Sequence, residues 1–157
     1  MFYKLQIIQS LRISPEKLAN CKNDQVRRAV ACNAYTSSNV LKKLAADENV
    51  YVRSNVASNP NTDLTTLKKM SMDKESMVVR YVASNPKTDS KTLSKLSEHT
   101  DYLVREEIAK NPNTERKILR KLAADDVMYV RYAVAENPNT EKDILEKMSL
   151  KSLKKGC

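Results

Sequence analysis

The chain of 157 residues contains one glycine, one histidine, one phenylalanine and no tryptophan. Phosphate-binding loops of the P-loop and dinucleotide types need several glycines, so the single Gly156 excludes both. Scarce glycine also argues against an all-β fold, whose tight turns use this residue freely. The single His99 excludes metal sites built from several histidines and leaves nucleophile–histidine chemistry dependent on one residue. These absences favour an all-helical binding protein over an enzyme.

Cysteines and long apolar segments are also few. Cys21, Cys32 and Cys157 are odd in number and widely spaced, which is typical of reduced thiols in a cytoplasmic protein rather than of a disulfide framework. No run approaches the roughly 18 apolar residues that cross a bilayer. The first twelve residues lack the cleavage site of a signal peptide. We therefore expect a cytoplasmic protein with no membrane partner.

Positive charge, in contrast, is abundant. The chain has 28 Lys and Arg residues against 19 Asp and Glu residues, for a formal net charge of +9. Charged residues make up 30% and hydrophobic residues 41% of the chain, a balance that fits a folded domain rather than a disordered one. The excess of positive charge leaves a polyanionic partner open.

An internal repeat of 26 residues dominates the chain. Asn-Pro recurs at Asn59, Asn85, Asn111 and Asn137, and Asn33-Ala34 holds the same place one period earlier. Val, Ala and Thr columns keep the same step, as at Val52, Ala57 and Thr62 in the second unit. Self-similarity at a fixed period indicates a stacked architecture. The period predicts a degenerate cap over residues 1–22, five units over residues 23–48, 49–74, 75–100, 101–126 and 127–152, and a basic tail over residues 153–157.

Each unit is predicted to form two short helices. In the second unit, the first helix is expected to begin at an N-cap Thr62 and to bury Leu67 and Met70 on one stripe. The following helix is expected to begin near Asp73 and to end at the Asn of Asn-Pro, because proline disfavours the α conformation in the preceding residue. Helices this short are marginal alone. Stability must therefore come from stacking the units into an all-α solenoid.

The repeated pattern is Val-Arg-x-x-Val-Ala-x-Asn-Pro-x-Thr, followed by Leu-x-x-Leu-Ala or Leu-x-x-Met-Ser. Over residues 23–152 it resembles the leucine-rich repeat variant family. The resemblance implies a right-handed superhelical solenoid of alternating α- and 3₁₀-helices, with protein interaction as the usual presumed role. A relative in that family carries an iron–sulfur module. Three scattered cysteines cannot supply the four thiolates of such a cluster, so we expect no iron–sulfur module and no other cofactor.

Two polar columns are interpreted as structural. The arginines are expected to bond helix-end carbonyls or aspartate caps, although a row of anion-binding guanidinium groups is the alternative. The asparagines are expected to bond backbone groups of neighbouring turns. The members of the two columns are Arg27, Arg53, Arg105 and Arg131, and Asn33, Asn59, Asn85, Asn111 and Asn137.

A lysine column is the candidate polyanion-binding site. In a stacked solenoid its ammonium groups should follow one line, which could track a phosphate backbone. The alternative is a solvated face, because Lys in the last turn of a helix compensates the helix dipole. We name this column the lysine row, and its members are Lys17, Lys43, Lys69, Lys95, Lys121 and Lys147.

Variable positions of the second helix are the candidate protein-binding site. They are Arg28, Arg80, Tyr81, Glu106 and Tyr132. Ser54 shares the column of Arg28 and Arg80 and is expected to be exposed like them, whereas Tyr51 and Tyr129 are expected to be half-buried packing residues. Amphipathic rings of this kind are common interface anchors.

Three function classes remain open at this point. The leading hypothesis is a non-catalytic scaffold that binds a macromolecular partner, most readily a protein. The alternative is sequence-nonspecific binding of nucleic acid along the lysine row. An enzyme comes third, because His99 takes the place of a capping Asp and Cys32 occupies a variable helix position matched by Ser58 and Ser84. We therefore expect no catalytic residue, no metal and no small-molecule substrate.

Overall fold

The computed structural model describes residues 14–154, which form eleven α-helices and no strand. Helices of two lengths alternate along the chain. The nine-residue helices are α3 (Asp24–Cys32), α5 (Val50–Ser58), α7 (Ser76–Ser84), α9 (Tyr102–Lys110) and α11 (Met128–Glu136). The seven-residue helices are α4 (Ser38–Leu44), α6 (Leu64–Met70), α8 (Ser90–Leu96) and α10 (Arg116–Leu122). The short α2 (Pro15–Leu18) and the longer α12 (Lys142–Lys154) complete the set.

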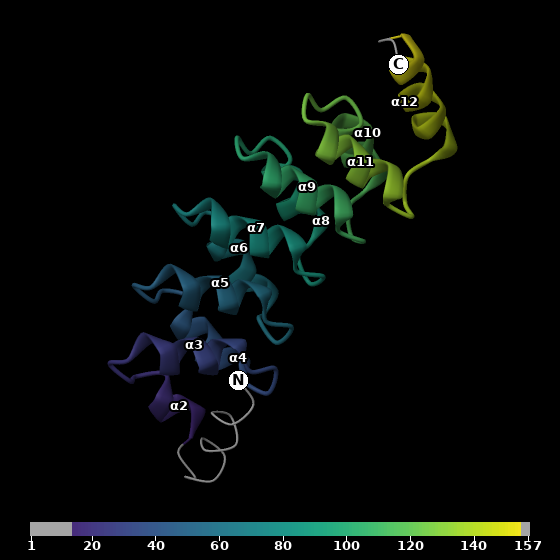
Figure 1. Ribbon diagram of the computed structural model, residues 1–157. Helices are drawn as coiled ribbons and strands as arrows, with labels where there is room; N and C mark the ends of the chain where they lie inside the picture. Colours follow the sequence, from purple (N-terminus) through teal and green to yellow (C-terminus); the bar gives the residue numbers. More distant parts are fainter. Residues whose placement is uncertain (1–13, 155–157) are drawn as a thin grey trace.

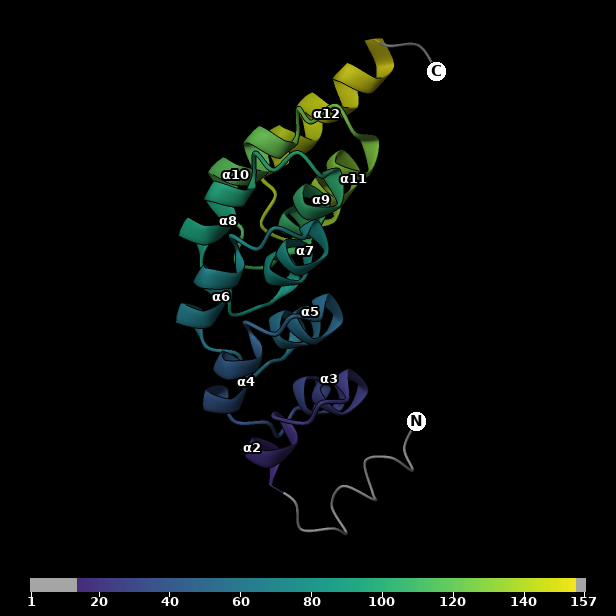
Figure 2. The ribbon, with the colours of Figure 1, turned by 90° about the vertical axis from the view of Figure 1, so that its left-hand side faces the viewer.

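The two lengths form two separate columns. Figure 2 shows α4, α6, α8 and α10 stacked on one side and the nine-residue helices stacked on the other. Consecutive nine-residue helices pack directly on one another, and each seven-residue helix contacts the nine-residue helix that follows it. The result is an elongated solenoid in which α2 and α12 lie at opposite ends (Figure 1).

The hydrophobic core runs continuously through the stack, from Ala19 to Ile144. Leucines of the seven-residue helices and valines of the nine-residue helices supply its fully buried positions, for example Leu67 and Val56. Burying one such side chain contributes about 1.5–3 kcal/mol. No unit covers these residues alone, so each repeat depends on its neighbours. The predicted all-α solenoid with a period of 26 residues is therefore observed.

The seven-residue helices begin one residue later than the Thr column predicts. Asp63 is the N-cap of α6 and accepts a hydrogen bond from Thr66 N at 2.8 Å. Thr62 instead donates through Oγ1 to the carbonyl of Val56 at 2.5 Å, at the end of the preceding helix. The predicted N-cap role of the threonines is therefore wrong. Their hydroxyls satisfy a helix-end carbonyl instead, as they also do at Thr36, Thr88, Thr114 and Thr140.

The nine-residue helices end at the asparagines as predicted, but proline is not required for this. Asn59 precedes Pro60 and has φ −70° and ψ 130°. Asn33 precedes Ala34 and adopts almost the same extended conformation, with φ −74° and ψ 119°. The Oδ1 atom of Asn33 accepts a hydrogen bond from Tyr35 N at 2.9 Å. Side-chain bonds of this kind stop the helix even where the proline is missing.

The helix type differs in one respect from what the family resemblance implies. Both helices of each repeat are α-helical throughout the described part of the chain, with no separate 3₁₀-helix there. Hydrogen bonds of the i→i+3 type occur at the helix ends, as from Asp47 N to Leu44 O at 3.1 Å. The exact unit boundaries stay predictions. Most of the proposed cap (residues 1–13) and the end of the tail (residues 155–157) lie outside the described residues.

Candidate interaction surfaces

Arginine side chains join neighbouring turns of the stack. The Nε and NH2 atoms of Arg53 bind the two carboxylate oxygens of Asp73 at 2.7 and 3.1 Å. Its NH1 atom donates to the carbonyls of Asp47 and Glu48 at 2.8 and 3.1 Å. One planar guanidinium thus connects two turns through paired, charge-assisted bonds. We name this arrangement a brace, and it recurs at Arg27 with Asp47 and at Arg105 with Asp125.

The aspartates of the braces are held ionised. Burial is the largest single effect on the pKa of Asp73 and raises it. The hydrogen bonds from Arg53 and from the Glu75 N–H, together with the positive charge of Arg53, outweigh burial and hold this pKa below its ordinary value of 3.8. Asp47 and Asp125 respond in the same way to their arginines. The three braced guanidinium groups are therefore occupied within the protein. Arg131 donates to the carbonyls of Asp125 and Asp126, and no carboxylate of a described residue lies within ion-pair distance of it.

Asparagine side chains form a second set of internal bonds. The Nδ2 atom of Asn85 donates to the carbonyls of Ala57 and Asn59, at 2.7 and 3.2 Å. Asn59, Asn111 and Asn137 repeat this pattern. Asn33 is partly exposed, and one period earlier its acceptors would fall on residues 5 and 7, outside the described residues. The buried amides therefore use their hydrogen-bonding capacity inside the stack rather than toward a ligand.

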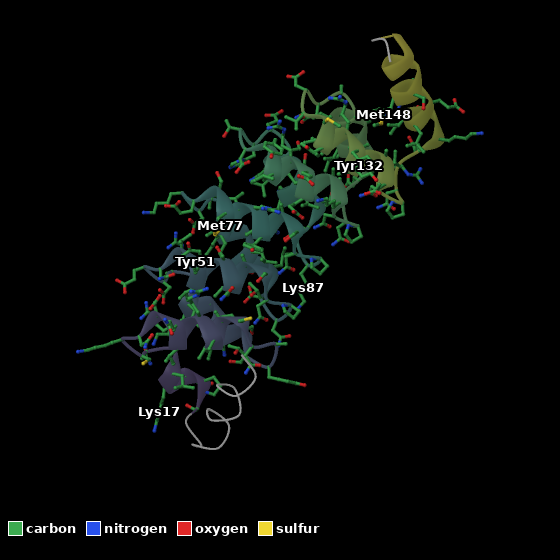
Figure 3. All side chains as sticks on the ribbon, in the orientation of Figure 1. Lys17, Tyr51, Met77, Lys87, Tyr132 and Met148 are labelled. Atoms are coloured by element: carbon green, nitrogen blue, oxygen red, sulfur yellow. The ribbon has the colours of Figure 1, made fainter. Side chains whose placement is uncertain are left out.

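The lysine row lies on the column of seven-residue helices, with one exposed member on each of α2, α4, α6, α8, α10 and α12. Figure 3 labels Lys17 at the α2 end. Lys121 pairs with Glu98 at 2.6 Å and Lys147 pairs with Asp143 at 3.4 Å. Lys69 and Lys95 form no ion pair with any described residue. The lysine row therefore runs along the whole stack, but some of its ammonium groups are paired with carboxylates and others are not.

Other cations beside the lysine row also pair with acids. Lys68 binds Asp89 at 2.8 Å, and this hydrogen bond, with one from Thr92, lowers the pKa of Asp89 to about 2. Arg120 binds Glu141 at 2.5 Å. Residues 1–22 hold four basic residues and one acidic residue, and residues 153–157 hold two lysines, so these end segments carry five of the nine net positive charges. The stack between them carries only a small excess.

The nine-residue helices expose a different kind of surface, which we name the tyrosine face. Its residues lie on the nine-residue helices outside the buried Val and Ala stripe, as exposed Tyr51 does beside buried Val52. Figure 3 shows Tyr51, Met77 and Tyr132 following one another along the solenoid. The face consists of Tyr51, Met77, Tyr81, Tyr102, Met128, Tyr129 and Tyr132, each 37–63% exposed. It holds seven of the ten exposed large hydrophobic side chains of the described residues.

Specific contacts fix parts of the tyrosine face. The guanidinium of Arg28 lies 4.9 Å from the ring centroid of Tyr51. Further along, the rings of Tyr102 and Tyr129 stack with centroids 6.4 Å apart and an interplanar angle of 27°. A hydrogen bond to Glu136 raises the pKa of the Tyr132 hydroxyl. The predicted protein-binding residues all lie on this column of helices: Arg28, Arg80, Tyr81, Glu106 and Tyr132.

Two expectations about exposure need correction. Tyr51 and Tyr129 are half-buried as expected, at 49% and 58% exposed, but they are more exposed than Tyr81 at 41%, which was expected to be the better exposed contact. Ser54 was expected to be exposed, but it is only 3% exposed and its Oγ has no hydrogen-bond partner. The sequence offers a signal for the tyrosines, since each directly precedes a buried valine. It offers no comparable signal for Ser54, whose burial depends on the helices that flank it.

The described residues contain no obvious reaction centre. No group of three or more His, Cys, Asp and Glu among them could hold a metal ion, and no helix among them is long and apolar enough to span a membrane. The Nδ1 atom of His99 accepts a hydrogen bond from Asp101 N at 3.1 Å, so this histidine serves at a helix start. Two open hollows, of about 470 and 170 Å³, lie beside Asn113 and between α10 and α12, and their linings contain neither histidine nor cysteine.

Comparison with known proteins gives structural likenesses but no match in sequence. No family model matches the chain, and no curated protein matches it. The structure is similar to a solved leucine-rich repeat variant. That structure, described as having a novel repetitive protein structural motif, shares 20% identity over 87% of this chain and 71% of its own, with a TM-score of 0.40. The two-helix repeat itself is seen directly in the helices of this chain.

Proposed function

We propose that the protein is a non-catalytic scaffold that binds a protein partner on its tyrosine face. The observation that carries the proposal is the concentration of exposed Tyr and Met side chains on one surface of the stack. Contiguous apolar patches on a folded protein commonly mark interaction sites, and tyrosine is enriched among residues that dominate binding energy. The stacked helices below hold these side chains in place, so little ordering is needed on binding.

The arginines and asparagines of the repeat support a scaffold rather than an enzyme. Three of the four repeated arginines are engaged in braces, and four of the five repeated asparagines bond the backbone of the preceding unit. Catalysis would need a positioned nucleophile or base with a partner that activates it. The free Cys21 and Cys32 favour a reducing compartment such as the cytoplasm.

Polyanion binding along the lysine row is the alternative function. Lys69 and Lys95 support it, because both are exposed and form no ion pair with the described residues. The pairing of Lys121 and Lys147 with carboxylates weighs against a uniform track. Lysines also act as point donors, so such a row positions phosphates without reading bases.

A capture experiment with matched variants tests the proposed function. Immobilised wild-type protein, a Tyr81→Ser/Tyr132→Ser variant and a Lys69→Gln/Lys95→Gln variant are incubated with source-cell lysate, with and without nuclease. We expect protein partners that survive nuclease, are lost with the tyrosine variant and are kept with the lysine variant. Loss of all captured material after nuclease, or loss with the lysine variant alone, would instead support the polyanion alternative. Circular dichroism spectra confirm that both variants are folded.

A further inference from the structure

We infer that the α9–α11 end of the tyrosine face binds an arginine side chain from a basic segment of a protein partner. This inference rests on the proposed function and names the chemistry of the partner. It comes from comparing two pairs of helices within the same chain, α3–α5 and α9–α11, which occupy equivalent positions in the repeat.

The α3–α5 pair supplies its own cation. There the guanidinium of Arg28 lies over the ring of Tyr51, 4.9 Å from the centroid. A shift of three repeats, or 78 residues, carries Arg28 onto Glu106 and Tyr51 onto Tyr129. The tyrosine is therefore kept in the α9–α11 pair, but the residue that covers it is replaced by one of opposite charge. A carboxylate at this position attracts a cation, and within the chain Lys110 of the same helix pairs with it.

The rings of the α9–α11 pair are arranged to receive a cation. Tyr102 and Tyr129 stack with their centroids 6.4 Å apart, and Tyr132 on α11 is 63% exposed. The negative ring face of tyrosine attracts a guanidinium or ammonium group. No cation of a described residue lies over any of these three rings, whereas Arg28 covers Tyr51. The three tyrosine rings are therefore available to a cation from a partner.

The charges around these rings favour a basic segment over an acidic one. Residues 101–111 contain three acids and two bases. Arg105 is already bound to Asp125 and Glu107 to Arg80, so Asp101, Glu106 and Lys110 are the charges of this segment that remain. Glu136 bonds the hydroxyl of Tyr132 and adds a further carboxylate. Lys110 pairs with Glu106 at 2.5 Å, and the Lys110 side chain is 48% exposed while that of Glu106 is 18% exposed. An incoming guanidinium must therefore share the Glu106 carboxylate with the half-exposed Lys110 or displace it.

Arginine fits the position better than lysine. Its guanidinium is planar, stacks on aromatic faces and can bind a carboxylate through two N–H groups at once. The internal example also uses arginine, at Arg28. At the α3–α5 end that same Arg28 repels a second cation. The basic segment is therefore expected at the α9–α11 end alone.

A titration of the full chain with short peptides tests the inference. The probes are acetyl-Gly-Arg-Gly-Arg-Gly-amide and the same peptide with citrulline, the uncharged isostere of arginine. Ring signals of labelled tyrosines are followed by NMR. We expect the signals of Tyr102, Tyr129 and Tyr132 to shift with the arginine peptide and that of Tyr35, which is 90% exposed elsewhere, to stay fixed. The citrulline peptide should bind at least about threefold more weakly, which matches the loss of one exposed cation–π interaction.

Two charge variants sharpen the test. Glu106→Gln should weaken binding of the arginine peptide about threefold or more, since it removes the carboxylate beside the rings. Glu98→Gln removes an exposed acid on the other column, where Glu98 pairs with Lys121, and should leave binding unchanged. Equal binding of the arginine and citrulline peptides, or equal effects of the two variants, would overturn the inference.

The outcomes also separate this inference from the proposed function. Capture of a nuclease-resistant partner through Tyr81 and Tyr132, without any preference for the arginine peptide, would leave the scaffold proposal standing and overturn the arginine assignment. If the signals of Tyr102 and Tyr129 shift when the protein alone is concentrated, the occupant is a second copy of this basic chain. That result would overturn the assignment to a different protein.

Discussion

One junction of the stack is built differently from its neighbours, and the contrast shows which interactions the repeat needs. Arg53 with Asp73 and Arg105 with Asp125 form braces around the second and fourth units. Between them, at the equivalent positions of the third unit, stand Val79 and His99. Val79 is almost fully buried. Both members of the ion pair are thus replaced together, and the fold continues across this junction without a change of period.

The turn directly before the next nine-residue helix survives this exchange, and the N-caps themselves are Asn49 in α5 and Asp101 in α9. Asp47 Oδ1 accepts a hydrogen bond from Asn49 N at 2.9 Å, and His99 Nδ1 accepts one from Asp101 N at 3.1 Å. What is lost is the guanidinium that joins two turns. A buried ion pair can be exchanged for apolar packing at little cost, whereas removing one partner alone strands a charge. The repeat therefore keeps the side-chain bond to the N-cap N–H at both kinds of junction and accommodates either form of the side-chain pair.

The largest effect is expected when one brace is broken on one side only. Asp73→Ala strands the guanidinium of Arg53, whose side chain is 9% exposed, and removes the acceptor for Glu75 N. We expect the free energy of unfolding to fall by about 3 kcal/mol. Urea unfolding followed by circular dichroism at pH 7 measures this loss.

The junction at Val79 supplies the control for that variant. Arg53→Val/Asp73→His copies the natural alternative pair and should recover at least half of the loss, because no charge is stranded. If the double variant is as unstable as Asp73→Ala, the two kinds of junction are not interchangeable and the comparison fails.

A smaller loss is expected from a single asparagine of the stack. Asn85→Ala removes two donated hydrogen bonds and leaves the carbonyls of Ala57 and Asn59 without this amide. We expect a loss of about 2 kcal/mol in the same urea experiment. Asn55→Ala is the matched control, since Asn55 is partly exposed and makes one long bond to Arg28 O at 3.3 Å. It should cost less than about 0.5 kcal/mol, and equal losses would show that the buried amides have no special role.

The period made most of the architecture predictable from the sequence. Repetition of Leu67, Val56 and Asn59 at 26-residue steps predicted the buried stripes and the helix ends, because stacking repeats the same environment at every step. The N-caps were misplaced by one residue. Thr62 and Asp63 are both good capping residues, and only the structure shows that the hydroxyl bonds a carbonyl six residues earlier.

Less of the candidate interaction surface was predictable. Tyr51 and Tyr129 align with Met77 and Leu103, so the sequence suggested packing residues, but both rings are more exposed than that of Tyr81. The contrast between Arg28 and Glu106 was visible as a column. The sequence does not show that Arg28 lies over the ring of Tyr51 in the next helix, or that Tyr102 stacks on Tyr129. These contacts depend on how neighbouring helices stack, which the spacing of residues in the sequence does not give.

A reverse exchange at the exceptional junction should have a small effect at pH 7 and a clear dependence on pH. Val79→Arg/His99→Asp installs a fourth brace, and we expect stability within about 1 kcal/mol of wild type at pH 7. The pKa values of Asp47, Asp73 and Asp125 lie below their ordinary value of 3.8. Their stabilisation is therefore present above about pH 4 and is lost as the pH falls through the folded-state values.

The added aspartate should behave as the other three do. Urea midpoints between pH 7 and pH 2 should fall more steeply for the variant than for wild type. Parallel curves for the two proteins would mean that the new carboxylate is not braced.

The smallest effects on stability are expected on the lysine row, which contains both lysines in ion pairs and lysines without one. Lys69→Gln/Lys95→Gln removes two exposed ammonium groups that have no acidic partner among the described residues, and should change stability by less than about 0.5 kcal/mol. Lys121→Gln/Lys147→Gln breaks the pairs with Glu98 and Asp143, at a cost of up to about 1 kcal/mol.

Binding to duplex DNA at low salt separates the two lysine variants more sharply than stability does. If the row binds phosphates, Lys69→Gln/Lys95→Gln should flatten the slope of log affinity against log salt by about 2, near 0.9 for each phosphate that is no longer neutralised, and weaken all sequences alike. Lys121→Gln/Lys147→Gln should change the slope less, because Glu98 and Asp143 already neutralise those lysines. Equal slopes for both variants would show that internal pairing does not decide which lysines are available. Absence of any binding by the wild-type protein would identify the row as a solvated face, and partner binding would then rest on the tyrosine face.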